Sequence, residues 1–171
     1  MATYFDMLST TNEVKKEYFF MRFLIQRVTS AKVDVEGKTV GAIDHGFLVF
    51  IGVCNTDNKA IADAMVKKLL GLRIFRDENG KTNLSLSDVG GSLLLISQFT
   101  LYADCHHGNR PSFINAGAPD MAEELYEYII DACRPHVKAL ATGVFGADMA
   151  VSIENQGPFT IMLDSEEIVK K

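Results

Sequence analysis

Residues 47–53 read Phe-Leu-Val-Phe-Ile-Gly-Val, and this apolar run decides the fold. A strand that is apolar at nearly every position is typical of the centre of a sheet that is covered on both faces. Before it, residues 22–28 and 31–35 alternate between apolar and polar side chains, as half-buried strands do. Residues 36–39 predict a turn, from which residues 40–43 return as a further strand. The first part of the chain therefore predicts neighbouring strands of one sheet.

Two amphipathic helices are predicted from apolar side chains that recur every three or four residues. The first follows Asp57, the expected N-cap, and ends near Gly71. The second begins at Pro119, since proline is favoured in the first helical turn, and ends at Pro135. We therefore expect an α+β fold: a single domain with a curved or barrel-like, mostly antiparallel β-sheet and two main helices packed outside it. The remaining strands are expected at 72–75, 92–101, 137–142, 147–154 and 159–163, with a long loop over 102–118.

The strand pattern begins at Met21, and the residues before it are different in character. Residues 1–20 lack a basic region followed by an apolar one, so they do not resemble a signal peptide. We interpret residues 1–20 as an N-terminal extension outside the core fold, able to form a peripheral helix. Residues 21–171 are then expected to form the domain.

The composition limits the classes of partner. Acidic residues outnumber basic ones by 22 to 17, and the resulting net charge of −5 argues against broad binding of DNA or RNA. The apolar runs are too short to span a membrane, and three cysteines without a CxxC pair favour a reducing cytoplasm. A small basic patch aimed at one end of an RNA stays open as the alternative to a solvated mixed-charge surface. Its candidates are Arg22, Arg27, Lys32, Arg73, Arg76 and Arg110.

Polar side chains follow the apolar run 93–96, where residues 97–101 read Ser-Gln-Phe-Thr-Leu. Hydroxyl and amide groups, together with the N–H groups of a strand end, have the chemistry of an oxyanion site. A threonine nucleophile needs an adjacent base, and the motif contains none. The alternative is a strand end that merely alternates polar and apolar residues. His106 and His107 have no third ligand at a telling spacing, so neither a metal nor another cofactor is predicted.

A second motif, Asn-Gln-Gly-Pro-Phe-Thr at residues 155–160, places a proline between two strand-like segments. Proline cannot donate to a strand ladder and is confined to edges, bulges and turns. Composition alone favours a hairpin turn at Gly157-Pro158. The alternative is a cis peptide bond that turns main-chain carbonyls into a pocket as fixed acceptors.

The two motifs, in this order over nearly the whole chain, resemble those of the D-aminoacyl-tRNA deacylase family, also called D-tyrosyl-tRNA deacylases. The resemblance runs from Met21 to about Leu163. Phe159 is a departure, because valine is commoner after Gly-Pro, and residues 1–20 have no counterpart. The resemblance is also carried by Ile-Gln-Arg-Val at 25–28, Leu-Arg-Ile-Phe at 72–75 and Arg-Pro-Ser-Phe at 110–113.

The resemblance implies a homodimer with active sites at the subunit interface. Gly157 and Pro158, joined by a cis bond, would reach into the partner's site and select the D configuration, because an L side chain would clash with their main chain. Arg27 is implied to hold the incoming Gly-Pro carbonyl, and Phe145 and Met149 to form the pocket wall. Glycine carries no side chain, so glycyl-tRNA, mischarged on tRNA-Ala, is an implied second substrate.

The implied reaction is hydrolysis of the ester that joins a D-amino acid to the terminal adenosine of tRNA. Main-chain N–H groups of Phe99 and Thr100 would bind the oxyanion, while Ser97 and Gln98 orient the substrate. We expect Thr100 to position rather than attack, since no base adjoins it. The expected partner is the acceptor end of aminoacyl-tRNA, not DNA or a membrane. A non-catalytic RNA-end binding module and a structural dimer remain the alternatives.

Overall fold

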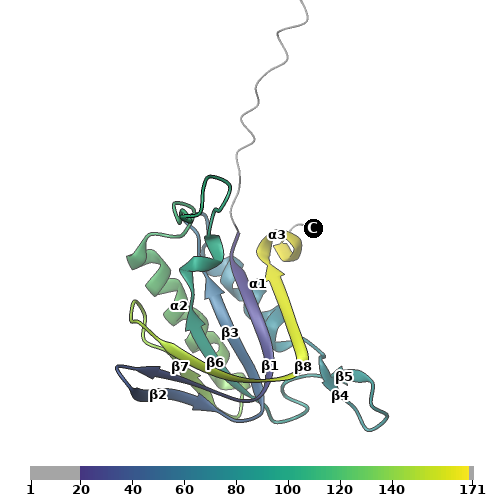
Figure 1. Cartoon of the computed structure of the whole chain (residues 1–171). Helices are drawn as coiled ribbons and strands as arrows, with labels where there is room; N and C mark the ends of the chain where they lie inside the picture. Colours follow the sequence, from purple (N-terminus) through teal and green to yellow (C-terminus); the bar gives the residue numbers. More distant parts are fainter. Residues whose placement is uncertain (1–19, 170–171) are drawn as a thin grey trace, which may run out of the picture.

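The central strand of the sheet is β3 (Gly46–Gly52). It contains most of the apolar run 47–53, from which a central strand is predicted. In the computed structural model, which describes residues 20–169, β3 pairs antiparallel with β1 (Arg22–Val35) and parallel with β6 (Ser92–Ser97). The sheet order is β2-β1-β3-β6-β7, and β8 pairs antiparallel with β1 (Figure 1). The other elements are β2 (Lys38–Ile43), α1 (Lys59–Leu70), β4 (Phe75–Arg76), β5 (Thr82–Leu84), the 3-10 helix η1 (Phe99–Tyr102), α2 (Pro119–Cys133), the 3-10 helix η2 (Arg134–His136), β7 (Leu140–Thr142), β8 (Ala150–Asp164) and α3 (Ser165–Val169).

Both faces of β3 are covered, which explains why its sequence does not alternate. Phe47, Val49 and Ile51 belong to the large core cluster on the helical side of the sheet. Leu48 points to the opposite side and packs in a second cluster with Leu94 of the neighbouring strand β6. Because successive side chains of a strand point to opposite faces, a strand between two apolar layers must be apolar throughout.

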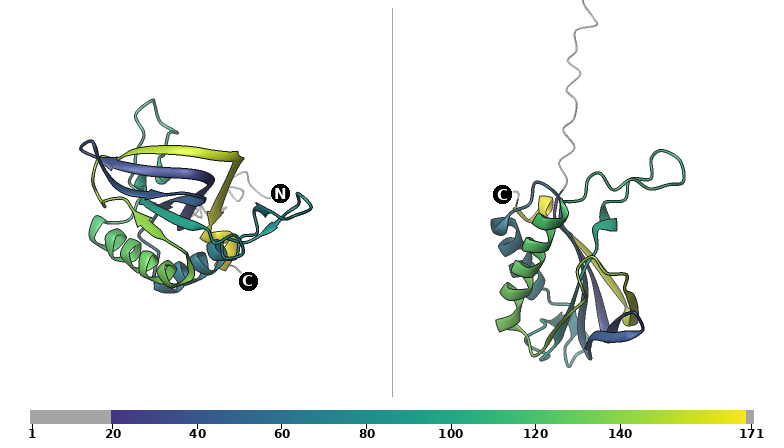
Figure 2. Two further views of the ribbon diagram at one scale, coloured as in Figure 1. Left: turned by 90° about the horizontal axis from the view of Figure 1, so that it is seen from below. Right: turned by 90° about the vertical axis from the view of Figure 1, so that its left-hand side faces the viewer.

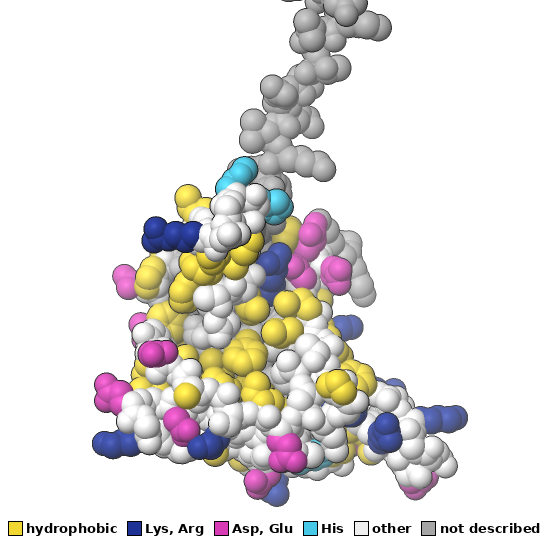
Figure 3. Space-filling view, in the orientation of Figure 1, with side chains coloured by type: hydrophobic (Ala, Val, Ile, Leu, Met, Phe, Trp, Pro, Cys, Tyr) yellow, Lys and Arg dark blue, Asp and Glu magenta, His cyan; other side chains and the backbone are white. Residues whose placement is uncertain are grey.

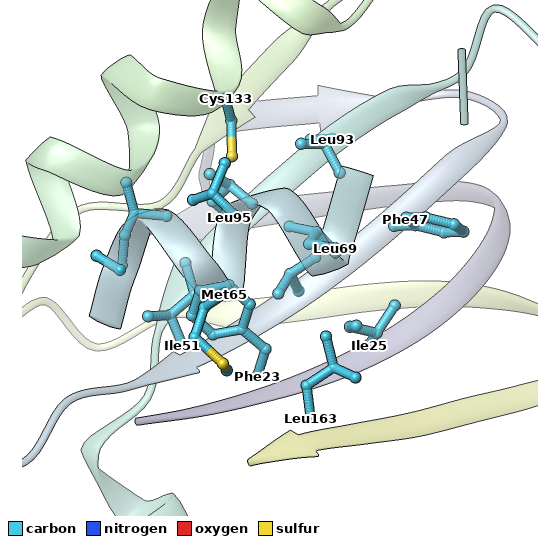
Figure 4. Close-up of a cluster of buried hydrophobic side chains, with 14 of the residues drawn as sticks. Phe23, Ile25, Phe47, Ile51, Met65, Leu69, Leu93, Leu95, Cys133 and Leu163 are labelled. Atoms are coloured by element: carbon cyan, nitrogen blue, oxygen red, sulfur yellow. The ribbon is translucent and has the colours of Figure 1, made fainter. Parts of the chain in front are cut away.

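Helices α1 and α2 lie side by side on one face of the sheet (Figure 2). Met65 and Leu69 of α1, Leu93 and Leu95 of β6, and Cys133 of α2 meet in the core between them (Figure 4). Burial raises the pKa of the Cys133 thiol to about 12, so this cysteine is a neutral, space-filling side chain.

The long strand β1 gives the sheet its curvature. Its first half pairs with β3 and the end of β8, and its second half pairs with β2 and the start of β8. The sheet curls until β2 approaches β7, where a Cβ atom on Gly41 would lie 2.5 Å from the carbonyl oxygen of Thr142. The expected barrel-like single domain with helices outside is confirmed. The strands predicted at 22–28 and 31–35 are one continuous strand.

Some strand boundaries differ from the sequence-based expectation. The strand predicted over 92–101 ends at Ser97, and the chain continues as η1. The strands predicted at 147–154 and 159–163 are joined in β8. The predicted N-terminal extension lies outside the described residues except for Phe20. No helix within residues 20–169 is long and apolar enough to cross a membrane.

Asp57, expected as the N-cap of α1, has a different role. The cap is Asn58, whose side chain accepts a hydrogen bond from the Ile61 N–H at 3.1 Å. The Asp57 carboxylate is buried and accepts the N–H groups of Met21 at 3.1 Å and Cys54 at 2.8 Å. Asp57 therefore ties the start of β1 to the chain that leaves β3. Burial raises the pKa of its carboxyl.

We expect Asp57→Ala to lower the free energy of unfolding by about 2–4 kcal/mol, because two buried N–H groups lose their acceptor. Urea unfolding followed by circular dichroism measures the change. Asp131→Ala on the exposed side of α2 is the control, with an expected change of about 0.5 kcal/mol or less. Equal stabilities of the two variants would contradict the role assigned to Asp57.

Candidate active site

A cavity of about 410 Å³ opens where β6 ends. Its wall is contributed by the ends of β3 and β6, the start of η1, the first turn of α2 and the segment that leads into β8. Hydrophobic side chains also gather in the middle of the face shown in Figure 3, while charged side chains lie mainly round its edge. The predicted site residues that line the cavity are Ser97, Gln98, Phe99, Phe145 and Met149.

The start of η1 supplies two main-chain donors next to this cavity. Gln98 ends the sheet pairing by donating its N–H to the Ile51 carbonyl at 2.7 Å. The chain then turns into η1, whose first two N–H groups, of Phe99 and Thr100, have no carbonyl within the helix to receive them. Among residues 20–169 the structure gives these two N–H groups no other acceptor. Two adjacent free N–H groups have the chemistry of an oxyanion site.

The Thr100 side chain does not line the cavity but is hydrogen-bonded to Gln98, which does. The Gln98 side-chain amide donates a hydrogen bond to the Thr100 hydroxyl oxygen. The Thr100 side chain is exposed, and within the described part of the chain no His, Asp or Glu is hydrogen-bonded to it. The hydroxyl therefore has an orienting partner and no general base, which is the arrangement of a positioning group.

His106 of the 102–118 loop is bound within the loop itself. The His106 ring lies 2.6 Å from the Asp104 carboxylate, and the hydrogen bonds from the His106 main chain and ring lower the pKa of Asp104. Asp104 also pairs with Ser112 across the loop through two main-chain hydrogen bonds. Within residues 20–169, no three His, Cys, Asp or Glu side chains are placed to hold a metal ion together.

An aromatic residue to which the sequence prediction gave no role supports the cavity wall through Phe99 without lining the cavity itself. Phe113 packs edge-to-face on Phe99, with ring centroids 5.1 Å apart. On the far side, Phe145 contacts the ring of Tyr126, whose hydroxyl donates to the Leu95 carbonyl at 2.8 Å. Phe113 is the aromatic residue of the Arg-Pro-Ser-Phe motif at 110–113. That motif was the feature of the sequence that could have indicated its contact with the site.

Gly157 and Pro158 lie on a wide bulge of β8, not in a hairpin turn. Gln26 pairs with Thr160 and Val28 with Asn155, so four residues of β8 stand opposite Arg27 alone. The bulge frees proline from the strand ladder, where it has no N–H to donate. The described residues contain no cis peptide bond, so the Gly157–Pro158 bond is trans and the expected cis bond is absent here.

Arg27 holds the bulge within its own chain. Its buried guanidinium donates to the Gln156 carbonyl at 3.1 and 3.3 Å and to the Ile74 carbonyl, and it lies 4.7 Å from the ring centroid of Phe159. Burial, with a smaller effect of Arg76, lowers the pKa of Arg27. Within the chain, Arg27 therefore binds the carbonyl of Gln156, the residue that precedes the Gly-Pro unit.

The predicted site residues thus form two groups in one chain. The first group surrounds the cavity at the end of β6. Arg27 and Gly157 instead line a separate hollow of about 380 Å³ beside β4. Pro158 and Gly157 are both exposed, and neither lines the cavity that contains Ser97.

A cavity beside free main-chain donors is the type of site found in hydrolases of activated esters. Residues 24–164 match the family model described as D-Tyr-tRNA(Tyr) deacylase. The chain belongs to this family of hydrolases, which act on the ester bond of aminoacyl-tRNA.

Individual relatives agree with the family match. The chain is 53% identical over 148 residues to the D-aminoacyl-tRNA deacylase of Thermosipho africanus, covering 86% of this chain and 99% of the relative. A solved structure named c-Myc DNA Unwinding Element Binding Protein is 38% identical with a TM-score of 0.78, covering 83% and 97% of the two chains. A probable eukaryotic D-amino acid tRNA deacylase, 19% identical, has the same fold with a TM-score of 0.76, covering 85% and 100%.

Proposed function

We propose that this chain removes D-amino acids from tRNA by positioning the ester and stabilising its oxyanion. The observation that carries the mechanism is the pair of free N–H groups of Phe99 and Thr100 beside the cavity at the end of β6. An aminoacyl ester is already activated, so orientation and oxyanion stabilisation suffice without an acid–base pair in the protein.

In the proposed reaction, water adds to the ester carbonyl carbon and the carbonyl oxygen becomes an oxyanion. The N–H groups of Phe99 and Thr100 donate to that oxyanion, while Ser97 and Gln98 orient the substrate. The carbon–oxygen bond to the ribose then breaks, and the ribose oxygen leaves with a proton that originates from the water. A neighbouring ribose hydroxyl assists the transfer of this proton. The products are free D-amino acid and tRNA.

Chiral selection is proposed to come from a second copy of the chain. Gly157 and Pro158 are exposed on their bulge and absent from the wall of their own cavity, which fits a role in the partner's site. Their main chain would exclude an L side chain, and Arg27 would fix the bulge through the Gln156 carbonyl. Glycine, having no side chain, would pass this filter, so glycyl-tRNA mischarged on tRNA-Ala is the proposed second substrate.

The proposed partner is the acceptor end of tRNA, and the proposed compartment is the cytoplasm. A net charge of −5 suits an enzyme that contacts only one end of the RNA. Within residues 20–169 the cysteines form no disulfide bond, as expected of a reducing compartment.

The test follows ester loss from D-Tyr-tRNA, L-Tyr-tRNA and Gly-tRNA(Ala), with light scattering for the oligomeric state. Rapid hydrolysis of D-Tyr-tRNA and Gly-tRNA(Ala), together with a dimeric state of the protein, supports the proposal. Binding of D-Tyr-tRNA without loss would make the chain a binding module. If the protein neither binds D-Tyr-tRNA nor hydrolyses its ester, a structural role is the reading that is left. Equal hydrolysis of the D and L esters would contradict the chiral filter.

We expect Thr100→Ala to retain kcat within about tenfold, because its hydroxyl positions the Gln98 amide and its N–H remains. Removal of a true nucleophile costs on the order of 10⁶ in kcat. Thr100→Ser, which keeps an acceptor for Gln98, is the matched control with near wild-type kcat. Single-turnover kinetics on D-Tyr-tRNA measure both. An acyl-enzyme on Thr100, captured by acid quench of the wild type, would show the positioning role to be wrong.

A further inference from the structure

Arg22, at the start of β1, is joined to the far end of η1. Its guanidinium Nη1 donates to the Leu101 carbonyl at 3.0 Å, and its Nε donates to the Asp164 carboxylate at 3.1 Å. The guanidinium also lies 5.4 Å from the ring centroid of Tyr102. In Figure 1 the start of β1 and the end of β8 lie side by side, and the register pairs Arg22 with Asp164. A cation is thus fixed on the last turn of η1.

A hydrogen-bonded series of peptide groups runs from this cation to the candidate oxyanion site. Arg22 donates to the carbonyl of the Leu101–Tyr102 peptide. In the i to i+3 pattern of the 3-10 helix, the Tyr102 N–H of that peptide donates to the Phe99 carbonyl. The Phe99 carbonyl belongs to the same peptide group as the free Thr100 N–H. Hydrogen bonds in series polarise one another, and a charged donor at the start increases the effect.

The end of η1 is also anchored mechanically. The Tyr102 hydroxyl lies between two carbonyl oxygens, that of Phe20 at 2.8 Å and that of Gly52 at 2.9 Å, and its single proton is shared between these acceptors. This anchor remains when Arg22 is replaced, so the helix keeps its place while the charge on the Leu101 carbonyl is lost.

We propose that Arg22 is a positioning residue that strengthens the Thr100 N–H as an oxyanion donor through the peptide groups of η1. The inference rests on the proposed oxyanion role of the Phe99 and Thr100 N–H groups. Arg22 acts on the transition state, where the negative charge on the ester oxygen develops, and does not contact the amino acid.

The experiment compares Arg22→Met with Arg22→Lys and Asp164→Asn in single-turnover and steady-state assays on D-Tyr-tRNA. Methionine keeps much of the apolar stem and removes the charge. We expect Arg22→Met to lower kcat about tenfold with KM within about twofold, and Arg22→Lys to restore part of kcat. Asp164→Asn breaks the ion pair but leaves the cation on the Leu101 carbonyl, so its kcat should stay near wild type.

The Thr100 amide proton provides a readout that does not depend on activity. In ¹⁵N-labelled protein, Arg22→Met should shift this resonance upfield, as expected for a less polarised N–H, while Asp164→Asn should not. An unchanged kcat in Arg22→Met, a rise in KM alone, or an equal loss in Asp164→Asn would overturn the inference. If Phe99→Pro lowers kcat and Arg22→Met does not, only the role of Arg22 fails; if neither does, the oxyanion site itself fails.

Discussion

Phe99→Pro is expected to lower kcat on D-aminoacyl-tRNA by about 10²–10³, the usual cost of losing one oxyanion donor. The substitution removes a main-chain N–H that donates to no group among residues 20–169. Phe99 is the first residue of η1, a position that proline favours. Gln98 before it has φ −144° and ψ 82°, outside the helical region that a following proline excludes. The fold should therefore accept the change.

Phe99→Ala is the matched control, because it removes the same aromatic ring and keeps the N–H. Since that ring lines the cavity and packs on Phe113, we expect Phe99→Ala to raise KM and to leave kcat within a few-fold, about 1 kcal/mol in the barrier. Steady-state kinetics and thermal unfolding of both variants separate chemistry from stability. Equal kcat values for the proline and alanine variants would remove the Phe99 N–H from the mechanism.

Gly46→Ala is expected to cost about 4 kcal/mol or more of unfolding free energy, a large share of the total for a domain of this size. Gly46 pairs with Ser92 where β3 meets β6. A Cβ atom on Gly46 would lie 1.9 Å from the Ser92 carbonyl oxygen and 2.7 Å from its nitrogen. The main-chain atoms of two paired strands cannot move apart without breaking the hydrogen bonds between the strands. The clash at Gly46 therefore cannot be relaxed by a small movement.

Gly80→Ala is the control for Gly46→Ala. Gly80 has φ +74°, and a Cβ atom there would meet nothing within 4 Å. Gly80→Ala is therefore expected to lower the free energy of unfolding by only about 1 kcal/mol, because alanine is less stable than glycine in the left-handed conformation. Chemical unfolding of the two variants measures the difference. Similar losses would show that β3 and β6 can separate locally, contrary to the contact at Ser92.

The sequence predicted those elements whose signals are local. The apolar run 47–53, the helix ending near Gly71 and the helix starting at Pro119 are all confirmed. Asp57 was misassigned because capping statistics describe a side chain beside its own helix. In the structure its carboxylate accepts the N–H of Met21, which is 36 residues away. Such a contact has no local signature.

The candidate site was predicted in part. The Ser-Gln-Phe-Thr-Leu motif marked the end of a buried strand, but its pattern of alternating residues predicted that the strand continued. Only the pairing of Gln98 with Ile51, and the turn that follows, reveal that the chain leaves the sheet and frees two N–H groups. For residues 155–160, composition favoured a hairpin turn, whereas pairing with β1 on both sides produces a bulge.

By itself, therefore, the sequence determined the strands, the helices, the two motifs and the family, because periodicity and motif identity are carried by neighbouring residues. The tertiary structure decided which groups meet. It placed Phe145 and Met149 against the end of β6, the Gly157 bulge against Arg27, and the Arg22 cation against the last turn of η1. The contact between the bulge and Arg27 depends on the register of β8 on β1, which joins residues more than a hundred positions apart and is specified where one face of the sheet is buried.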